Sequence, residues 1–303
     1  MKALTLHRQP FRAMGSVCEL QLYAADAAQA QRAGDMTRAE VARLEQRYSR
    51  YRDDSITTQI NRSAGDARGV EVDDETAGLL DYAQQAYELS DGLFDISSGV
   101  LRKVWDFKSG KLPPQAQIDA QLARVGWGRL RWQRPRIVLP HAGMELDFGG
   151  YVKEYAADAA AACARRNGIA HGLVELGGDI AVIGPHPDAS AWQVGIRHPR
   201  APETAMATVE LREGGIASSG DYERCMLING ERYSHILDPR TGWPVRGVAA
   251  VSVIAPQCLI AGTAATVTML KGVDGPAWLA ELGLPYLCTD GDGQLSGTLA
   301  RAV

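Results

Sequence analysis

Hydrophobic and polar positions follow two different periods along this chain. Residues 16–24 (Ser-Val-Cys-Glu-Leu-Gln-Leu-Tyr-Ala) alternate between polar and apolar, which is typical of a strand with one buried face. Residues 27–51 place Met36, Leu44 and Tyr51 on one side of a helical wheel, and this spacing predicts a long amphipathic helix. The first fifty residues therefore predict a strand followed by a helix.

Capping residues indicate where other helices begin and end. Asp73 or Asp74 is suited to cap a helix over about 75–90, and Asn167-Gly168 is a typical end for a helix that starts after Gly149-Gly150. An apolar pattern over residues 257–271 predicts another helix. Helices are thus expected in both halves of the chain.

Most predicted strands lie in the second half of the chain. Asn229-Gly230 is the strongest signal for a hairpin turn, and Arg134-Pro135 is expected to turn a hairpin over residues 129–139. The other predicted strands are residues 145–148, 173–176, 179–183, 192–198, 205–211, 226–228, 232–236 and 248–254. Helices mixed with mostly antiparallel strands, without regular βαβ alternation, indicate an α+β fold. We expect residues 1–303 to form a single domain of two intimate lobes.

Composition and charge exclude several classes of protein. The 303 residues carry 32 Lys and Arg against 36 Asp and Glu, a formal net charge of -4, so a general nucleic-acid binder is not expected. No apolar run is long enough for a transmembrane helix, and the N-terminal residues lack the pattern of a signal peptide, which favours a cytoplasmic protein. Five cysteines without Cys-x-x-Cys spacing predict reduced, mostly buried thiols.

Candidate chemistry gathers where polar residues surround glycines. The four such segments are Asp91–Asp95, Asp147–Lys153, Ser218–Tyr222 and Ser234–Gly242. Glycines let a ligand approach the backbone, and the carboxylates, histidine and lysine offer polar contacts. A structural alternative remains open for each segment, namely a tight turn in which an Asp caps its own backbone.

The segment after the second predicted hairpin is the most informative. It reads His-x-x-Asp-Pro-Arg-Thr-Gly, so an imidazole (His235), a carboxylate (Asp238) and a guanidinium (Arg240) lie within eight residues. His235 and Asp238 are the side chains we expect to serve as a catalytic base.

Read together, these segments resemble the FAD:protein FMN transferases, the ApbE-like flavin transferases. The matching motifs are Met14-Gly15-Ser16, Tyr48-Ser49-Arg50-Tyr51, Gly92–Asp95, Asp147–Gly150 with Lys153, Glu175–Asp179, Ser219–Tyr222, His235–Gly242 and Thr266. The resemblance implies an ApbE-like α+β fold with an FAD cleft between two subdomains. It also implies Mg²⁺-dependent transfer of FMN from FAD to a Thr or Ser hydroxyl of a flavin-accepting protein, with release of AMP. The acceptor implied is a redox subunit, and the oligomeric state stays open.

Site residues follow from the resemblance position by position. Those implied to bind FAD are Met14, Tyr48, Leu93, Phe94, Asp95, Asp147, Lys153, His235 and Ile236. Mg²⁺ would be held by the main-chain carbonyl at Gly150 and by Thr266.

Two positions depart from the pattern of the family. Gly262 stands where the family has a metal-binding Asp, and Glu154 stands where it has Gly. Glu154 is either a solvent-exposed helix residue or a replacement for the missing charge. Restoring the carboxylate by Gly262→Asp is expected to tighten Mg²⁺ binding. Three functions stay open: FMN transfer, FAD binding with weak or lost transfer, and metal-dependent hydrolysis of FAD to FMN and AMP.

Overall fold

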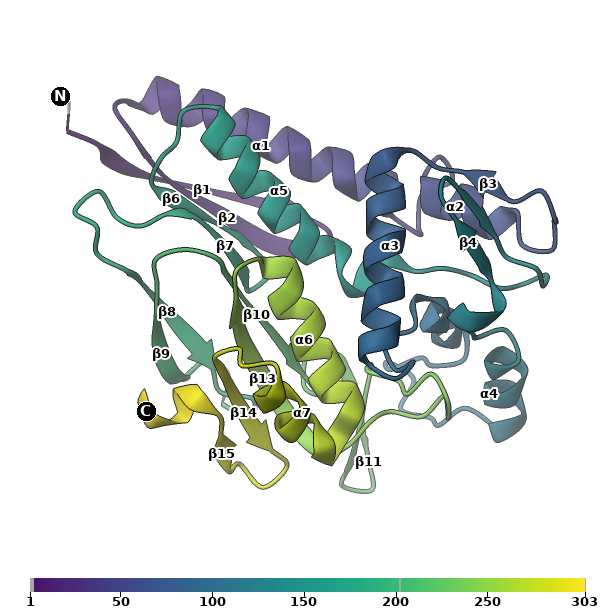
Figure 1. Ribbon diagram of the computed structural model, residues 1–303. Coiled ribbons are helices and arrows are strands. Elements are labelled where there is room, and N and C mark those ends of the chain that lie inside the picture. The colour runs from purple at the N-terminus through teal and green to yellow at the C-terminus, as the bar shows by residue number, and fades with distance from the viewer. Residues whose placement is uncertain (1–2, 202, 303) are drawn as a thin grey trace.

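An antiparallel sheet of eight strands forms the centre of the structure (Figure 1). The computed structural model describes residues 3–201 and 203–302 of the chain. In spatial order the strands are β1 (Thr5–Ala13), β2 (Ser16–Ala24), β6 (Gly172–Leu176), β7 (Asp179–Gly184), β10 (Gly215–Gly220), β13 (Val248–Ala255), β14 (Tyr286–Asp290) and β15 (Leu295–Ser296). Strands distant in sequence are therefore neighbours, and their ends bring distant motifs together.

The two faces of this sheet are covered differently. Helices cover one face (Figure 1): α1 (Ala27–Tyr48), α5 (Val152–Arg166), α6 (Cys258–Lys271) and α7 (Gly275–Glu281). A hairpin of β8 (Trp192–Arg197) and β9 (Ala205–Leu211) packs on the other face. Alternation along β6 explains this, because Val174 points into the helix-side core and Leu173 into the hairpin-side core.

A second lobe of short elements lies between α1 and α5 in sequence and beside the sheet and its helices in space (Figure 1). Its α-helices are α2 (Ile56–Arg62), α3 (Asp74–Leu89) and α4 (Gln115–Leu122). Its strands are β3 (Val70–Glu71), β4 (Arg131–Gln133) and β5 (Arg136–Val138), and its 3₁₀ helices are η1 (Ile96–Lys103), η2 (Trp127–Arg129) and η3 (Phe148–Gly150). The main core runs without a break from this lobe into the layer of helices.

The remaining elements complete the sheet side of the molecule. They are the hairpin β11 (Cys225–Ile228) with β12 (Glu231–Ser234), and the 3₁₀ helices η4 (Gly272–Asp274) and η5 (Thr298–Ala302). The β11–β12 pair turns at Asn229-Gly230, as its sequence predicts. The β11–β12 hairpin thus lies between the candidate segment Ser218–Tyr222 and the candidate loop that ends at Gly242.

The α+β fold and most elements of the sheet are confirmed, but two predicted segments are wrong in detail. Residues 145–148 form no strand, because the Asp147 Oδ1 accepts the Gly149 N–H at 2.9 Å and starts η3 instead. The first helix ends at Tyr48 rather than at residue 51, because Ser49 is extended. The sequence analysis missed β1, which contains Pro10 and lies at the sheet edge, where a missing N–H is tolerated.

Two predictions about whole residue classes can also be compared with the structure. All five cysteines are free thiols, and four of them are buried, as expected. Among the described residues, no helix combines the length and the apolar character needed to cross a membrane.

Candidate functional site

Four buried positions meet where α5, α6 and β7 pack together, and we call them the carboxylate cluster: Glu154, Asp179, Gly262 and Thr263. Lys153, which is partly exposed, borders the cluster. Asp158 fixes the two helices in register, because its carboxylate oxygens accept the N–H groups of Cys258 and Leu259, each at 2.9 Å. This contact caps the start of α6 with a side chain of α5.

Lys153 and Asp179 form the ion pair of the cluster. The Lys153 Nζ lies 2.6 Å from the Asp179 Oδ2, and the Asp179 Oδ1 accepts the Ser218 N–H at 3.1 Å. Burial by itself lowers the pKa of Lys153, but the carboxylates of Asp179 and Glu154 outweigh burial and raise it. Lys153 therefore stays a cation. It was expected to bind FAD, and in the structure it is also paired with Asp179.

Glu154 is buried, so the interpretation as a solvent-exposed helix residue is wrong. Only 8% of the residue is exposed, and its Oε2 is buried with no N–H or hydroxyl donating to it. Burial, and next the charge of Asp179, raise the pKa of Glu154 to about 8. A carboxylate in this position lacks the partner that buried charges normally have.

Gly262 leaves the space that Glu154 fills. A Cβ at position 262 would lie 2.5 Å from the Glu154 Cγ and 2.9 Å from its Cδ. The expected gain in Mg²⁺ binding from Gly262→Asp stays a prediction, and it requires Glu154 to move, because the new side chain and Glu154 would occupy one volume. Glu154 and Gly262 are coupled by packing.

The oxygen donors at this site fit a hard divalent cation. Thr266, one turn after Gly262 on α6, is partly exposed, and its hydroxyl lies 3.3 Å from the hydroxyl of Ser219 on β10. Hydroxyls, carbonyls and one unpaired carboxylate are the kind of donors that Mg²⁺ prefers, with water filling other positions. In residues 3–201 and 203–302, no three or more His, Cys, Asp or Glu side chains are grouped so that they could hold a metal ion by themselves.

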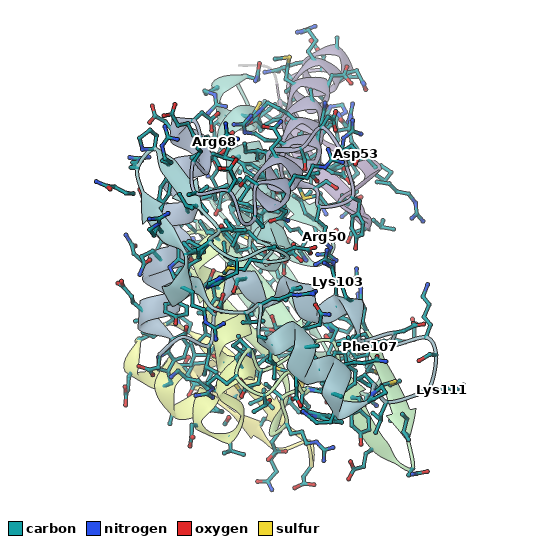
Figure 2. All side chains as sticks on the ribbon, turned by 90° about the vertical axis from the view of Figure 1, so that its right-hand side faces the viewer. Arg50, Asp53, Arg68, Lys103, Phe107 and Lys111 are labelled. Carbon is teal, nitrogen blue, oxygen red and sulfur yellow. The ribbon has the colours of Figure 1, made fainter. Side chains whose placement is uncertain are left out.

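A second group of charged side chains lies at the junction of the two lobes. Arg50 contacts the Asp147 carboxylate, and Lys103 contacts Glu145, two residues earlier. Figure 2 labels Arg50 and Lys103 on the side of the molecule that carries the second lobe. Asp147 is thus engaged by a guanidinium and by the turn that it caps. Arg50 is a candidate for anion binding that the sequence analysis did not select.

Several residues expected at the FAD site have structural contacts of their own. Asp95 is buried, and its carboxylate accepts hydrogen bonds from the Ser97 N–H at 2.8 Å and the Trp127 N–H at 2.9 Å. Burial raises the pKa of Asp95, and these hydrogen bonds oppose that effect. Tyr48 is buried and its ring packs on Phe148, with ring centroids 5.2 Å apart.

The apolar residues of the expected FAD site differ in exposure. Leu93 and Phe94 are buried, and the Phe94 ring packs edge-on against Tyr151, which follows Gly150. Met14 has a positive φ of 50° in the turn between β1 and β2 and packs against the main core, as does Ile236. These contacts leave open which of their edges a ligand would touch.

His235, Asp238 and Gly242 lie on the loop after β12, which docks onto the second lobe. The Trp105 Nε1–H donates to the Gly242 carbonyl at 2.9 Å, and a Cβ at Gly242 would overlap Ile118, so the close approach requires glycine. The Asp238 Oδ1 accepts the Arg240 N–H at 2.7 Å and thus caps its own turn. The His235 side chain is exposed at the surface, but desolvation by the surrounding protein, and next the charge of Arg224, lower its pKa and so favour the neutral imidazole.

The expected site residues lie in two regions of the structure. Lys153 and Thr266 border the carboxylate cluster, whereas His235 and Asp238 lie on the loop that joins the lobes. Asp179 was part of a motif but was not selected as a site residue. The signal that could have found it is a carboxylate opening an otherwise apolar strand.

Comparison with known proteins gives a consistent result. The sequence model of the ApbE family matches residues 14–288. A relative from Treponema pallidum, named FAD:protein FMN transferase, is 31% identical over 281 residues, covering 86% of this chain and 77% of the relative. A relative of the same name from Rhodobacter capsulatus is 29% identical over 283 residues, covering 91% of this chain and 54%, about half, of the relative.

Solved structures resemble the chain over nearly its whole length. The ApbE protein of Thermotoga maritima superimposes with a TM-score of 0.89 at 27% identity and covers 98% of both chains. The flavinyl transferase ApbE of Pseudomonas stutzeri, in its apo form, superimposes with a TM-score of 0.87 at 28% identity, covering 99% of this chain and 96% of the other.

Proposed function

The chain belongs to the ApbE family, and from this premise we propose that it is an FAD:protein FMN transferase. The observation that carries the proposal is the match over residues 14–288, together with relatives and solved structures whose names give flavin transfer. In the proposed reaction, a Thr or Ser hydroxyl of an acceptor protein attacks the FMN phosphorus. The bond to the AMP phosphate breaks, the hydroxyl proton passes to a base, and AMP leaves.

The chain's own residues account for several requirements of this reaction. Phosphoryl transfer depends mainly on positioning the groups and on neutralising charge. Lys153 presents a permanent cation, and Arg50 places a guanidinium at the junction of the lobes. Because its pKa is lowered, which favours the neutral imidazole, His235 is suited to accept the proton of the acceptor hydroxyl. Asp238 then orders the loop that carries His235, because its carboxylate caps the turn.

Mg²⁺ is the cofactor that fits the donors described above. The Gly150 carbonyl and Thr266 are the residues we propose to hold it. When bound, the cation would neutralise charge on the pyrophosphate of FAD. FAD itself is the substrate, and the acceptor is proposed to be a protein that carries covalent flavin.

Two other functions remain as outcomes of a direct assay. The protein is incubated with FAD and Mg²⁺, with and without a threonine-containing acceptor peptide, and the nucleotides are separated. Transfer predicts AMP only when the peptide is present, together with a flavin-labelled peptide. AMP with free FMN in the absence of peptide would instead show hydrolysis, and unchanged FAD under all conditions would show a protein that only binds it.

The role of His235 is tested by its removal. We expect His235→Ala to lower the rate of AMP formation by at least about 100-fold, because general base catalysis is lost. Its affinity for FAD should stay within about twofold, because the base acts in the transition state. The matched control is His141→Ala, an exposed histidine of the second lobe, which should change neither quantity. An equal loss of affinity and rate would show that His235 only binds FAD.

A further inference from the structure

The carboxylate cluster contains two carboxyl groups that compete for one ammonium group. The carboxyl groups are those of Glu154 and Asp179, and the ammonium of Lys153 contacts Asp179 at 2.6 Å. Asp179 is further satisfied by the Ser218 N–H. Glu154 is left with a buried Oε2 that no donor reaches. Since an unpaired charge is costly inside a protein, this arrangement calls for a further cation or for a proton.

The packing of α5 on α6 shows that Glu154 points at the helix that carries Thr266. Asp158 caps the start of α6 at Cys258. Glu154 lies one turn before Asp158 on α5, and Gly262 lies one turn after Cys258 on α6. Glu154 therefore faces Gly262 across the two helices as Asp158 faces Cys258. The short approach of the Glu154 Cγ to position 262 confirms this register.

The absence of a side chain at position 262 is what makes this contact possible. Positions 262 and 266 lie on the same face of α6, one turn apart. Glu154 therefore reaches from α5 to position 262. A side chain at that position would lie on the same face of α6 as Thr266. Both departures from the family pattern, Gly262 and Glu154, then have one cause.

We propose that Glu154 supplies, from α5, the anionic ligand of a divalent-cation site at the α5–α6 contact, with Gly262 providing the space for it. The cation is of the hard, oxygen-preferring class, Mg²⁺ or Mn²⁺. This inference rests on the proposed function for the use of the cation. It differs from that function in naming the residue of this chain that binds the cation.

The first test measures cation binding by the full-length protein without flavin. Mg²⁺ is titrated by calorimetry, and Mn²⁺ binding is followed by the electron paramagnetic resonance signal of the free ion. We expect Glu154→Gln, which keeps the size of the side chain, to weaken binding of both ions by at least about tenfold. Glu213→Gln changes an exposed carboxylate on the turn before β10 and should leave binding unchanged.

The opposite result has a definite meaning. If Glu154→Gln binds both ions as tightly as the parent protein, or if the parent binds neither ion, the proposal is wrong. In that case Glu154 and Asp179 share a proton, and the glutamine variant should be at least as stable as the parent in thermal unfolding, because it donates a hydrogen bond to Asp179 without a second charge.

A second test exchanges the carboxylate between the helices. Glu154→Ala alone should lose cation affinity, and Gly262→Asp alone should lower the melting temperature, because position 262 overlaps Glu154. The double variant removes the overlap and returns a carboxylate to the same space, so we expect affinity within about threefold of the parent protein and a recovered melting temperature. Independent effects of the two changes would contradict the proposal.

Failure of this inference can be distinguished from failure of the proposed function. Cation binding that does not depend on Glu154, in a protein that still labels the acceptor peptide, would overturn only the inference. Cation binding that requires Glu154, in a protein that never releases AMP, would overturn only the transferase proposal.

Discussion

At the scale of single residues, glycines that look equivalent in the sequence have different roles. Gly78 lies on the exposed side of α3, and a Cβ there would contact nothing within 4 Å. Gly99 in η1 lies against Asp147, and a Cβ there would overlap the Asp147 Cβ. Since the Asp147 Cβ is attached directly to the backbone, it cannot move aside as the end of a long side chain would.

These two glycines give a matched pair of predictions. Gly78→Ala should stabilise the protein by about 0.5–1 kcal/mol, because alanine loses less backbone entropy in a helix. Gly99→Ala should destabilise it by about 1–3 kcal/mol, because the overlap with Asp147 forces a backbone shift. Urea denaturation followed by circular dichroism measures both. A Gly99→Ala variant as stable as the parent protein would contradict the overlap with Asp147.

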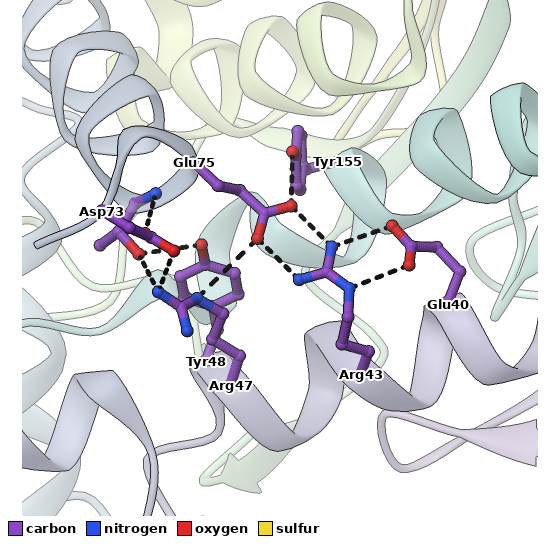
Figure 3. Close-up of polar contacts among 8 residues, drawn as sticks. Glu40, Arg43, Arg47, Tyr48, Asp73, Glu75 and Tyr155 are labelled. Atoms are coloured by element: carbon purple, nitrogen blue, oxygen red, sulfur yellow. Dashed lines mark hydrogen bonds and ion pairs between the residues drawn. The ribbon is translucent and has the colours of Figure 1, made fainter.

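At the scale of elements, charged side chains join α1 to the start of α3. Figure 3 shows the Arg43 guanidinium between Glu40 on its own helix and Glu75 on α3, and Arg47 beside Asp73. The Arg43 Nη2 lies 2.7 Å from the Glu75 Oε1. Asp73 also caps α3, so the network fixes both the start and the direction of that helix.

The pH dependence of stability tests this network. Hydrogen bonding and charge from Arg43 lower the pKa of Glu75. A carboxyl whose pKa is lower in the folded state stabilises the protein above its unfolded pKa, near 4.5, and this contribution is lost as the pH falls through the folded value.

We therefore expect Arg43→Met to reduce the free energy of unfolding by about 0.5 kcal/mol at pH 7, a value discounted for the partial exposure of the pair. The difference from the parent should shrink below pH 4 and in high salt. Arg52→Met, which removes an exposed pair with Asp54 within one loop, should leave stability unchanged. A deficit that is the same at pH 3 and pH 7 would show that Arg43 acts by packing instead.

At the scale of the whole molecule, one apolar core joins the two lobes. It contains Leu80 and Ile137 of the second lobe together with Val174 and Val253 of the large sheet. The loop after β12 adds a further connection, because Leu237 packs against a small buried cluster of the second lobe that includes Leu101. We propose on this basis that the two lobes form a single domain.

A single cooperative unfolding transition follows from this continuous core. We expect thermal unfolding followed by far-ultraviolet circular dichroism and by tryptophan fluorescence to coincide. Trp127 lies in the second lobe and Trp192 on the hairpin side of the sheet. The part of the fluorescence change that is lost when each is replaced by Phe therefore reports on its own region. Two separate transitions would show that the lobes fold independently.

Local signals determined much of this fold in advance. The alternation in residues 16–24, the turn at Asn229-Gly230 and the cap at Asp73 act within a few residues, and all three are observed. The edge strand β1 escaped notice because charged residues and Pro10 conceal its alternation. Glycine-centred motifs likewise indicated the family, because a close approach to the backbone requires glycine at a definite position in the sequence.

Tertiary structure alone decided which polar side chains are free to act. The sequence could not show that the carboxylates of Asp95 and Asp238 accept hydrogen bonds from backbone N–H groups, or that Lys153 is paired with Asp179. Nor could it choose between an exposed and a buried Glu154. That choice depends on how closely α6 approaches α5. The distance is set by the capping contact of Asp158 and by the missing side chain at Gly262, which is more than a hundred residues from Glu154 in sequence.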